Sequence, residues 1–252
     1  MEMPTPPAGT GKHPIALVVI SANDLAASSA FYASLFGWQM MKMSAELTGV
    51  AIPNGPPAAL RANIPAGFPG IVPYVGVANV DTTLARVTEA GGAIERAPWK
   101  IPMMGTLARF RDVSGTIYGV TDAIAPGGAP SIPMPFGSNP KPAAGTICSL
   151  EMYAVDERSP QFFGDLFGWG TMPTMPQFVA FDPGAGIGGV FQSHSPALPA
   201  IGYIYVDDVT STLTAIEGKG GQRQGDATGM PGMGTFGYFK DPSGTTMGLI
   251  GP

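Results

Sequence analysis

The sequence predicts an α+β protein in which four βαβββ modules are arranged as two similar halves of one chain. Two repeats predict this plan. FYASLFGW at residues 31–38 returns as FFGDLFGW at residues 162–169, and MGTLARFRDVSGTIYGV at 104–120 returns as MGTFGYFKDPSGTTMGL at 233–249. A third observation is the composition, since 36 Gly and 27 Pro among 252 residues are typical of short strands joined by many tight turns.

The length fits two domains of ordinary size, because 252 residues are more than one small core requires. Pro and Gly crowd the stretch from residue 125 to residue 145, which favours a linker there. We therefore predict a first domain at residues 1–125, a Pro/Gly-rich linker at 126–145 and a second domain at 146–252.

The first helix of each half is predicted from its end signals and its apolar stripe. In the first half the β-branched run ALVVIS stops at Asn23 and Asp24, which can cap a helix that ends at Gly37. In the second half Ser159 is the expected cap, with Pro160 in the first turn and a stop at Gly168. The aromatic residues of both octets fall at helical spacing, so the octets are mainly core.

The rest of each half reads as a second helix followed by strands. Asp81 is the expected cap of TTLARVTEA (residues 82–90), and a Gly pair ends this helix in both halves. DVSG at 112–115 and DPSG at 241–244 read as β-turns that join hairpin strands. A half is then strand, helix and strands, twice over.

This order of a strand, a capped FYxxLFGW helix, a Gly pair and a DPxG turn resembles the vicinal oxygen chelate superfamily of glyoxalases, bleomycin resistance proteins and dioxygenases. The LFGW form is similar to a two-domain bacterial subgroup called glyoxalase-like or hydroxylase-like. The resemblance extends from about residue 14 to residue 250. It implies two tandem cupped-sheet, glyoxalase-like domains, each enclosing a site for a small molecule.

The resemblance also implies where a metal would be held in the metal-dependent members. The matching first-strand positions are Leu17 and a residue near Cys148, and the matching Glu positions after the turns are Gly119 and Gly248. The strand that opens each second module offers tyrosines instead of histidine. A divalent metal needs about three side-chain ligands, so we expect no metal and no other cofactor. The two histidines, His13 and His194, are expected on surface loops.

Acid-base or ligand-binding roles are therefore sought among other polar residues on the strands. Glu151 and Tyr238 are the candidate catalytic groups, because a strand carboxylate and a phenol can exchange protons. The candidate substrate-binding residues, which would line a cup if they point inward and face solvent otherwise, are Arg109, Tyr74, Tyr153, Tyr203 and Tyr205. The richer polar set favours the second cup as the working one.

Charge and hydropathy limit the partners. A net charge of −5 without any run of Lys or Arg argues against nucleic acid. The longest strongly apolar run, IALVVI at residues 15–20, is too short for a membrane span, and the Pro-rich opening lacks a signal-peptide core. With one cysteine, Cys148, the sequence suits a cytoplasmic protein. We expect a monomer or a homodimer with a small organic ligand.

Two functional hypotheses remain open. In the first, the protein binds a small, largely apolar organic molecule in a cup without a metal, either to sequester it or to act on it by acid-base chemistry. In the second, it is a metal-dependent lyase or dioxygenase of the same superfamily with displaced ligands. The scarcity of histidine, two in the whole chain, favours the first. The sequence does not decide between a binder and an enzyme.

Overall fold

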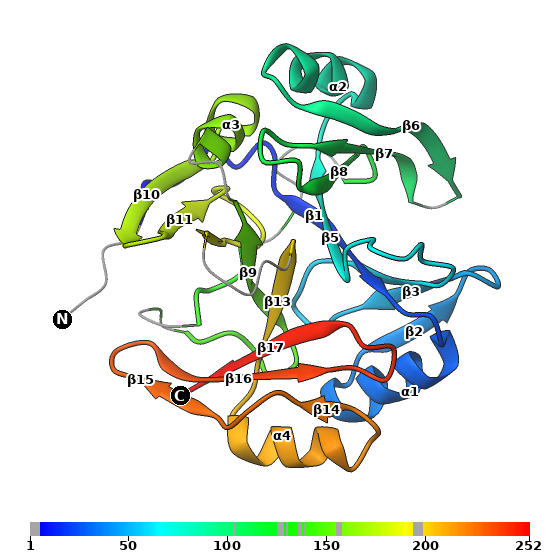
Figure 1. The fold of residues 1–252 in the computed structure, drawn as a ribbon, viewed down its shortest axis with the longest axis vertical. Helices are drawn as coiled ribbons and strands as arrows, with labels where there is room; N and C mark the ends of the chain where they lie inside the picture. Colours follow the sequence, from blue (N-terminus) through cyan, green and yellow to red (C-terminus); the bar gives the residue numbers. More distant parts are fainter. Residues whose placement is uncertain are drawn as a thin grey trace.

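The computed structural model describes residues 6–102, 104–124, 129, 131–135, 138, 140–154, 158–193 and 199–252. In this part of the chain two mixed β-sheets of similar plan lie side by side, with helices on the outside (Figure 1). The predicted α+β class is confirmed.

The first half forms an eight-stranded sheet from two modules. Its elements are β1 (Ile15–Ser21), α1 (Leu25–Phe36), β2 (Gln39–Lys42), β3 (Leu47–Ala51), β4 (Ala58–Arg61), β5 (Ile71–Gly76), α2 (Val80–Glu89), β6 (Ala93–Ile101), β7 (Gly105–Arg111) and β8 (Ile117–Thr121). The strands pair in the order β2-β3-β4-β1-β5-β8-β7-β6, so the two modules join through the antiparallel β1–β5 pair.

The second half repeats this order with one change. Its elements are β9 (Ile147–Tyr153), α3 (Arg158–Phe167), β10 (Gly170–Met175), β11 (Phe178–Asp182), β12 (Gly189–Gln192), β13 (Ala200–Tyr205), α4 (Val209–Glu217), β14 (Gln222–Arg223), β15 (Thr228–Met230), β16 (Gly234–Lys240) and β17 (Thr246–Gly251). Two short strands, β14 and β15, both pair with β16 where the first half has the single strand β6.

The predicted helix ends are confirmed for α1 and corrected for α2. Asp24 caps α1 by accepting the Ala27 N–H at 2.9 Å, and Gly37 ends the helix with a φ of 69°. The cap of α2 is Asn79 rather than Asp81. Asn79 has an extended backbone and accepts the Thr82 N–H at 2.8 Å, whereas Asp81 already lies inside the first turn.

The predicted cap of α3 is wrong, for a tertiary reason. The helix begins at Arg158, so Ser159 lies in its first turn. The Ser159 hydroxyl donates to Asp112 at 2.7 Å, a residue of the DVSG turn in the other half of the chain. The Ser159 side chain, which local sequence predicted to cap α3, instead makes a contact between the two halves.

The aromatic octets form core, as predicted. In the first octet Tyr32 stacks on Trp38 with ring centroids 4.6 Å apart, and the Trp38 indole N–H donates to the Gly145 carbonyl at 2.7 Å. In the second octet Phe163 stacks on Trp169 at 5.0 Å. Each ring is fully or almost fully buried, so the octets serve packing.

The first helix of each half, α1 or α3, docks on the hairpin of the other half. Phe31 of α1 lies 5.9 Å from Phe239 of β16, and the Tyr32 hydroxyl donates to Asp241 of the DPSG turn at 3.1 Å. Phe162 of α3 packs in the same way near Phe110 of β7, at 6.2 Å. Figure 1 shows α1 beside the β16–β17 hairpin. One hydrophobic core therefore runs through both halves.

The residues before β1 lie against the second half. The Thr10 N–H donates to the Gly168 carbonyl at 2.9 Å, and the Trp169 indole donates to the His13 carbonyl at 2.7 Å. The first sheet ends at Thr121 and the second begins at Ile147. The division of the chain into domains at 1–125 and 146–252 stays a prediction, because the core and this lead segment cross it.

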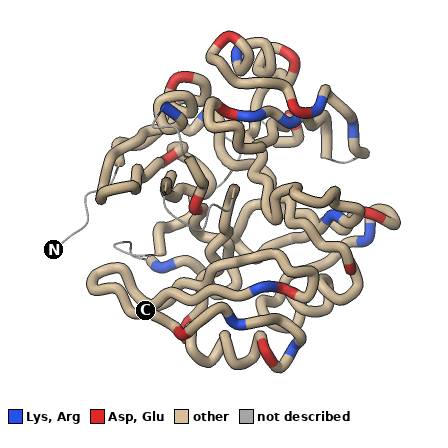
Figure 2. The backbone as a smooth tube through the Cα atoms, in the orientation of Figure 1, with Lys and Arg blue, Asp and Glu red and all other residues tan. Residues whose placement is uncertain are grey.

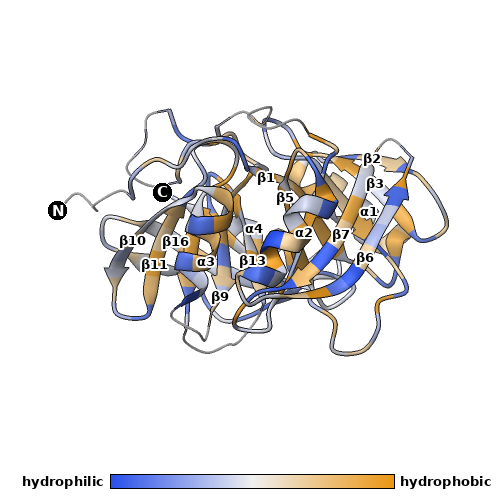
Figure 3. Cartoon of the chain, turned by 90° about the horizontal axis from the view of Figure 1, so that it is seen from above, coloured by the Kyte–Doolittle hydropathy of each residue, from blue (hydrophilic) through white to orange (hydrophobic). Residues whose placement is uncertain are grey.

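Alternate strand residues form a second face on each sheet, which we call a cup. In the first sheet this face packs separately from the shared core, whereas Ile201 and Tyr203 of the second cup belong to that core. The first cup is a separate small cluster of alternate strand residues: Leu17, Val19, Ala59, Val72, Tyr74, Leu107 and Ile117. Strand register puts Ser149, Glu151, Ile201, Tyr203 and Phe236 at matching positions of the second cup. Figure 3 shows the apolar strands at the centre of the molecule and hydrophilic residues on the edge strand β6.

Candidate functional site

The second cup brings together Glu151, Tyr203 and Tyr238, which come from β9, β13 and β16. The Tyr203 hydroxyl donates to Oε2 of Glu151 at 2.8 Å and lies 2.7 Å from the Tyr238 hydroxyl. Glu151 and Tyr203 are buried, with 7% and 5% of their surface exposed, while Tyr238 is partly exposed. We call these three residues the relay, because their oxygen atoms form a continuous chain from the interior to the edge of the cup.

A glycine makes the relay possible. Gly248 of β17 lies directly opposite Tyr203 on one side and Tyr238 on the other. A Cβ atom at this position would lie 2.4 Å from Cδ1 of Tyr203, which is far inside van der Waals contact. The space beside Gly248 is therefore filled by the ring of Tyr203, whose hydroxyl reaches Glu151 and Tyr238 from there.

Both phenols of the relay keep their protons at neutral pH. Burial raises the pKa of Tyr203 well above its usual value, and the nearby Glu151 carboxylate raises it further. Burial also raises the pKa of Tyr238, partly offset by its hydrogen bond to Tyr203. Because the bond from Tyr203 to Glu151 uses the only Tyr203 proton, the Tyr203 oxygen is left to accept from Tyr238. The Tyr238 oxygen, having donated its proton, keeps its lone pairs to accept from another group.

The other two predicted residues of the second half lie apart from the relay. Tyr153 is partly exposed two residues beyond Glu151, on the same face of β9, opposite Gln192. Tyr205 is buried at the end of β13. Its pKa is raised by burial and then by the negative charge of Asp207. The structure does not bring Tyr205 into contact with the relay.

Arg109 and Tyr74 lie in the first cup. Arg109 is 6% exposed, and its Nε donates to Oε2 of Glu95 at 2.6 Å, with Nη2 3.5 Å from the other oxygen. Tyr74 is buried beside it. Burial raises the pKa of Tyr74, and the positive charge and hydrogen bond of Arg109 lower it in part. Of the two strand orientations that the sequence left open, Arg109 has the inward one.

Sequence reasoning missed the residues that surround Arg109. They are Arg61, Phe68, Glu95, Arg96 and Trp99. Recognising β6 and β7 as a hairpin would have placed Arg96 opposite Arg109. The loop that carries Phe68 over the cup gives no comparable signal, since its position depends on tertiary packing.

Comparisons with known proteins agree with this fold. Residues 14–117 match the model of the Glyoxalase/Bleomycin resistance protein/Dioxygenase superfamily. A glyoxylase-like domain-containing protein of Didymella fabae is 33% identical over 116 residues, which cover 90% of that protein and 40% of this chain. The chain belongs to this superfamily.

More distant superfamily relatives extend the likeness over the whole chain. CFP32 of Mycobacterium tuberculosis, provisionally named a glyoxylase, is 24% identical over 253 residues, covering 93% of each chain. The Mn(II)-bound glyoxalase of Novosphingobium aromaticivorans has a TM-score of 0.64 at 17% identity, over 97% of this chain and 83% of that one. The 2,3-dioxygenase LapB of Pseudomonas sp. KL28 has a TM-score of 0.66 at 14% identity, over 97% and 93%. These two structures support the fold.

The metal expected of many superfamily members does not fit the side chains present. Strand register aligns Leu17, Tyr74 and Gly119 in the first cup. In the second cup it aligns Tyr203 and Gly248 with Ser149, one residue from the position near Cys148 that the sequence suggested. A Cβ at Gly119 would lie 2.1 Å from the Tyr74 ring, so in both cups a tyrosine ring fills the space that a glutamate would need.

The remaining candidate ligands also lie apart from one another. Among the described residues no group of three His, Cys, Asp or Glu could hold a metal ion. Burial raises the pKa of the Cys148 thiol to about 12, so it carries no thiolate at neutral pH. His13 contacts the Gly76 carbonyl at 3.0 Å and the edge of the Phe167 ring, outside both cups. His194 lies outside the described residues.

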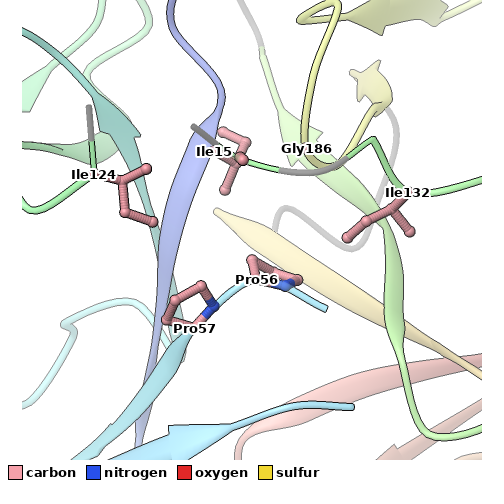
Figure 4. Close-up of a pocket in the computed structure, with 7 residues that line it drawn as sticks. Ile15, Pro56, Pro57, Ile124, Ile132 and Gly186 are labelled. Carbon is pink, nitrogen blue, oxygen red and sulfur yellow. The ribbon is translucent and has the colours of Figure 1, made fainter. Parts of the chain in front are cut away.

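Two hollows lie away from the cups. One, of about 210 Å³, lies between the halves and is lined by Ile15, Pro56, Pro57, Ile124, Ala129, Ile132 and Gly186 (Figure 4). The described residues of its lining include no polar side chain that would orient a ligand or react with one. The other is an open groove between α1 and α4. Among the described helices, none has the length and apolarity needed to cross a membrane.

Proposed function

We propose that this protein binds a small, largely apolar organic molecule in its second cup and exchanges a proton with it without a metal. The single observation that supports the proposal is the relay, in which a buried carboxylate is linked through Tyr203 to the hydroxyl of Tyr238, a partly exposed residue. Apolar contacts are available beside it, since Phe236 packs edge-on against Tyr203 with ring centroids 6.0 Å apart.

The relay can act as a base, accepting a proton from the ligand, when Glu151 is ionised. A ligand O–H, N–H or activated C–H group would give its proton to the Tyr238 oxygen, while the Tyr238 proton passes to Tyr203 and the Tyr203 proton passes to Glu151. The ligand is left as an anion and Glu151 becomes neutral, so the charge balances. The reverse sequence returns the proton. In this proposal Glu151 and Tyr238 are the catalytic residues, and Tyr203 and Tyr153 contact the ligand.

The first experiment separates metal-dependent from metal-independent function. Purified, untagged protein is examined by elemental analysis and native mass spectrometry, before and after addition of Fe(II), Mn(II), Ni(II) and Zn(II). We expect substoichiometric metal in every case and, where a ligand has copurified, an added organic mass. Stoichiometric binding of one of these metals at a defined site would contradict the proposal and favour a lyase or dioxygenase.

The second experiment tests proton exchange. 2-Indanone, a small apolar ketone with acidic C–H groups, is incubated with the protein in D₂O, and loss of its α-proton signals is followed by NMR. We expect exchange above the buffer rate and a loss of about 100-fold or more in Glu151→Gln. Tyr74→Phe, the first-cup counterpart of a change in Tyr203, is the matched control and should exchange normally. Tight binding of the ketone without exchange would indicate sequestration instead.

A further inference from the structure

The first cup contains an alternating row of arginines and aromatic rings, which we call the ladder. The Cζ atom of Arg61 lies 5.7 Å from the centre of the Phe68 ring, and that of Arg109 lies 4.8 Å from the same ring. On the other side of Arg109, Trp99 lies between it and Arg96, at 5.4 and 3.9 Å. Three guanidinium groups and two rings thus follow one another at the edge of the cup.

The charges of the ladder are only partly neutralised. Arg109 is paired with Glu95. Within the described part of the chain, the guanidinium groups of Arg61 and Arg96 contact these rings, and neither is seen in a hydrogen bond or an ion pair. Figure 2 shows acidic and basic residues interspersed along β6 and β7. Two of the three cations therefore remain available to an incoming anion.

The positive charges of the ladder lie close enough together to shift the pKa of Arg61. Burial lowers the pKa of Arg61, and the nearby charges of Arg109 and Arg96 lower it further, with Tyr74 and Glu46 acting in the opposite direction. A bound anion would relieve this repulsion, because a carboxylate between guanidinium groups makes strong, charge-assisted hydrogen bonds. The same arrangement would repel a cationic ligand.

The exposed parts of the ladder suit a flat ligand. Phe68 and Trp99 are partly exposed, and the apolar cluster beneath them includes Leu17, Leu107 and Ile117. A ring packed against these side chains gains apolar burial and aromatic contacts. A carboxylate on that ring would then lie within reach of the guanidinium groups at either end.

We propose that the first cup is a separate binding site for an aromatic carboxylate, with Arg61 and Arg96, at the two ends of the ladder, supplying the positive charge that attracts the carboxylate and with Phe68 and Trp99 packing against the ring. Arg109 remains paired with Glu95 and, through its contacts with Phe68 and Trp99, holds the two rings in place. The proposal does not depend on the relay, since the two cups lie on different sheets.

Isothermal titration calorimetry with 2-naphthoate tests the site. We expect one naphthoate bound per chain, binding at least about tenfold weaker for 2-naphthamide, which has the same shape without the charge, and weaker binding at high salt. No heat of binding for naphthoate, or equal binding of naphthamide, would overturn the proposal.

Substitutions in each cup test which of the two cups binds naphthoate. Arg61→Gln and Arg96→Gln should each weaken naphthoate binding by about tenfold. Arg86→Gln is the matched control, because Arg86 lies on α2 and its side chain contacts the Asp165 carbonyl instead. Tyr238→Phe should leave naphthoate binding unchanged. Loss of binding in Tyr238→Phe with normal binding in both ladder variants would show the second cup to be the site. All variants are compared at matched thermal stability.

Discussion

The two cups share one backbone plan but carry opposite charge. Where the first cup has Val19 on its first strand, the second has Glu151, and where the first has Arg109 on its hairpin, the second has Tyr238. A tyrosine lies on a glycine in both, as the Tyr74–Gly119 and Tyr203–Gly248 pairs. The repeat has kept the residues that pack on the sheet and changed polar residues that line the cups, which gives one cationic and one acidic cup.

The comparison implies that the tyrosine–glycine pair supports the structure of both cups. Changing the glycine therefore has the largest predicted effect on the free energy of unfolding. Gly248→Ala should destabilise the protein by about 1–3 kcal/mol, because the new Cβ overlaps the Tyr203 ring. Gly119→Ala should behave alike. Gly229→Ala, where no atom lies within 4 Å, is the control.

Urea unfolding measures these differences. Removal of the tyrosine ring should relieve the overlap, so Gly248→Ala combined with Tyr203→Ala should lose less stability than the sum of the single changes. If Gly119→Ala leaves the free energy of unfolding unchanged while Gly248→Ala lowers it, the tyrosine–glycine pair does not have the same structural role in both cups.

The halves also dock on each other with different polar groups, which allows a second test. Tyr32→Phe removes the hydroxyl that donates to buried Asp241 and should cost about 1–2 kcal/mol in the free energy of unfolding. Phe163, at the matching position of the second octet, has no hydroxyl to lose. Chemical unfolding compares Tyr32→Phe with Ser34→Ala on the same helix, which should be nearly neutral. A neutral Tyr32→Phe would mean that Asp241 is satisfied by its backbone donors alone.

The Asp241 carboxyl should add a pH dependence to this docking. Burial raises its pKa in the folded state, partly offset by hydrogen bonds from Thr245, Tyr32, Ser243 and Gly244. A raised folded pKa means that the native state binds the proton more tightly. This contribution to stability is therefore full below the unfolded pKa and is lost as the pH rises through the folded value.

Asp241→Asn should remove this dependence, changing the slope of stability against pH by at most about 1.4 kcal/mol per pH unit within the titration range. Thermal unfolding between pH 3.5 and pH 7, chosen to span about the usual carboxyl range, measures the slope. Asp226→Asn, an exposed control, should leave it unchanged. Parallel curves for wild type and Asp241→Asn would contradict the inference.

The smallest effect concerns the charge of the first cup. Glu95→Gln removes the carboxylate that pairs with Arg109 and makes the ladder more cationic. We expect naphthoate to bind about three- to tenfold more tightly to this variant at low salt. Glu89→Gln, on α2, is the control for net charge. Weaker binding in Glu95→Gln would mean that Glu95 organises the ladder rather than competing with the ligand.

Local sequence predicted the modules because their signals are local. Asp24 and Gly37 lie at the two ends of one helix, and the DVSG and DPSG turns need only neighbouring residues. The two errors at helix starts came from context. Asn79 was better placed than Asp81 to cap α2, and Ser159 was recruited by Asp112 from the other half.

The candidate site was predictable in part. The strand pattern selected Glu151, Tyr203 and Tyr238 as polar strand residues whose orientation it left open, and the structure links their oxygen atoms by hydrogen bonds. The same reasoning also selected Tyr205, which takes no part in the hydrogen bonds of the relay. The roles of these residues stay predictions. Phe68 and Trp99 were not predicted as site residues. Phe68 lies on a loop and Trp99 on an edge strand, and local sequence does not show which strands such segments pack against.

By itself, the sequence determined the repeat, the α+β modules and the lack of histidine and glutamate at the expected metal positions, since these follow from spacing and residue type along the chain. The tertiary structure decided which side chains meet. Strand register set Gly248 between Tyr203 and Tyr238, and hairpin pairing set Arg96 beside Trp99 and opposite Arg109. The physical reason is that such contacts join residues far apart in sequence, and only the pairing of strands fixes their distance.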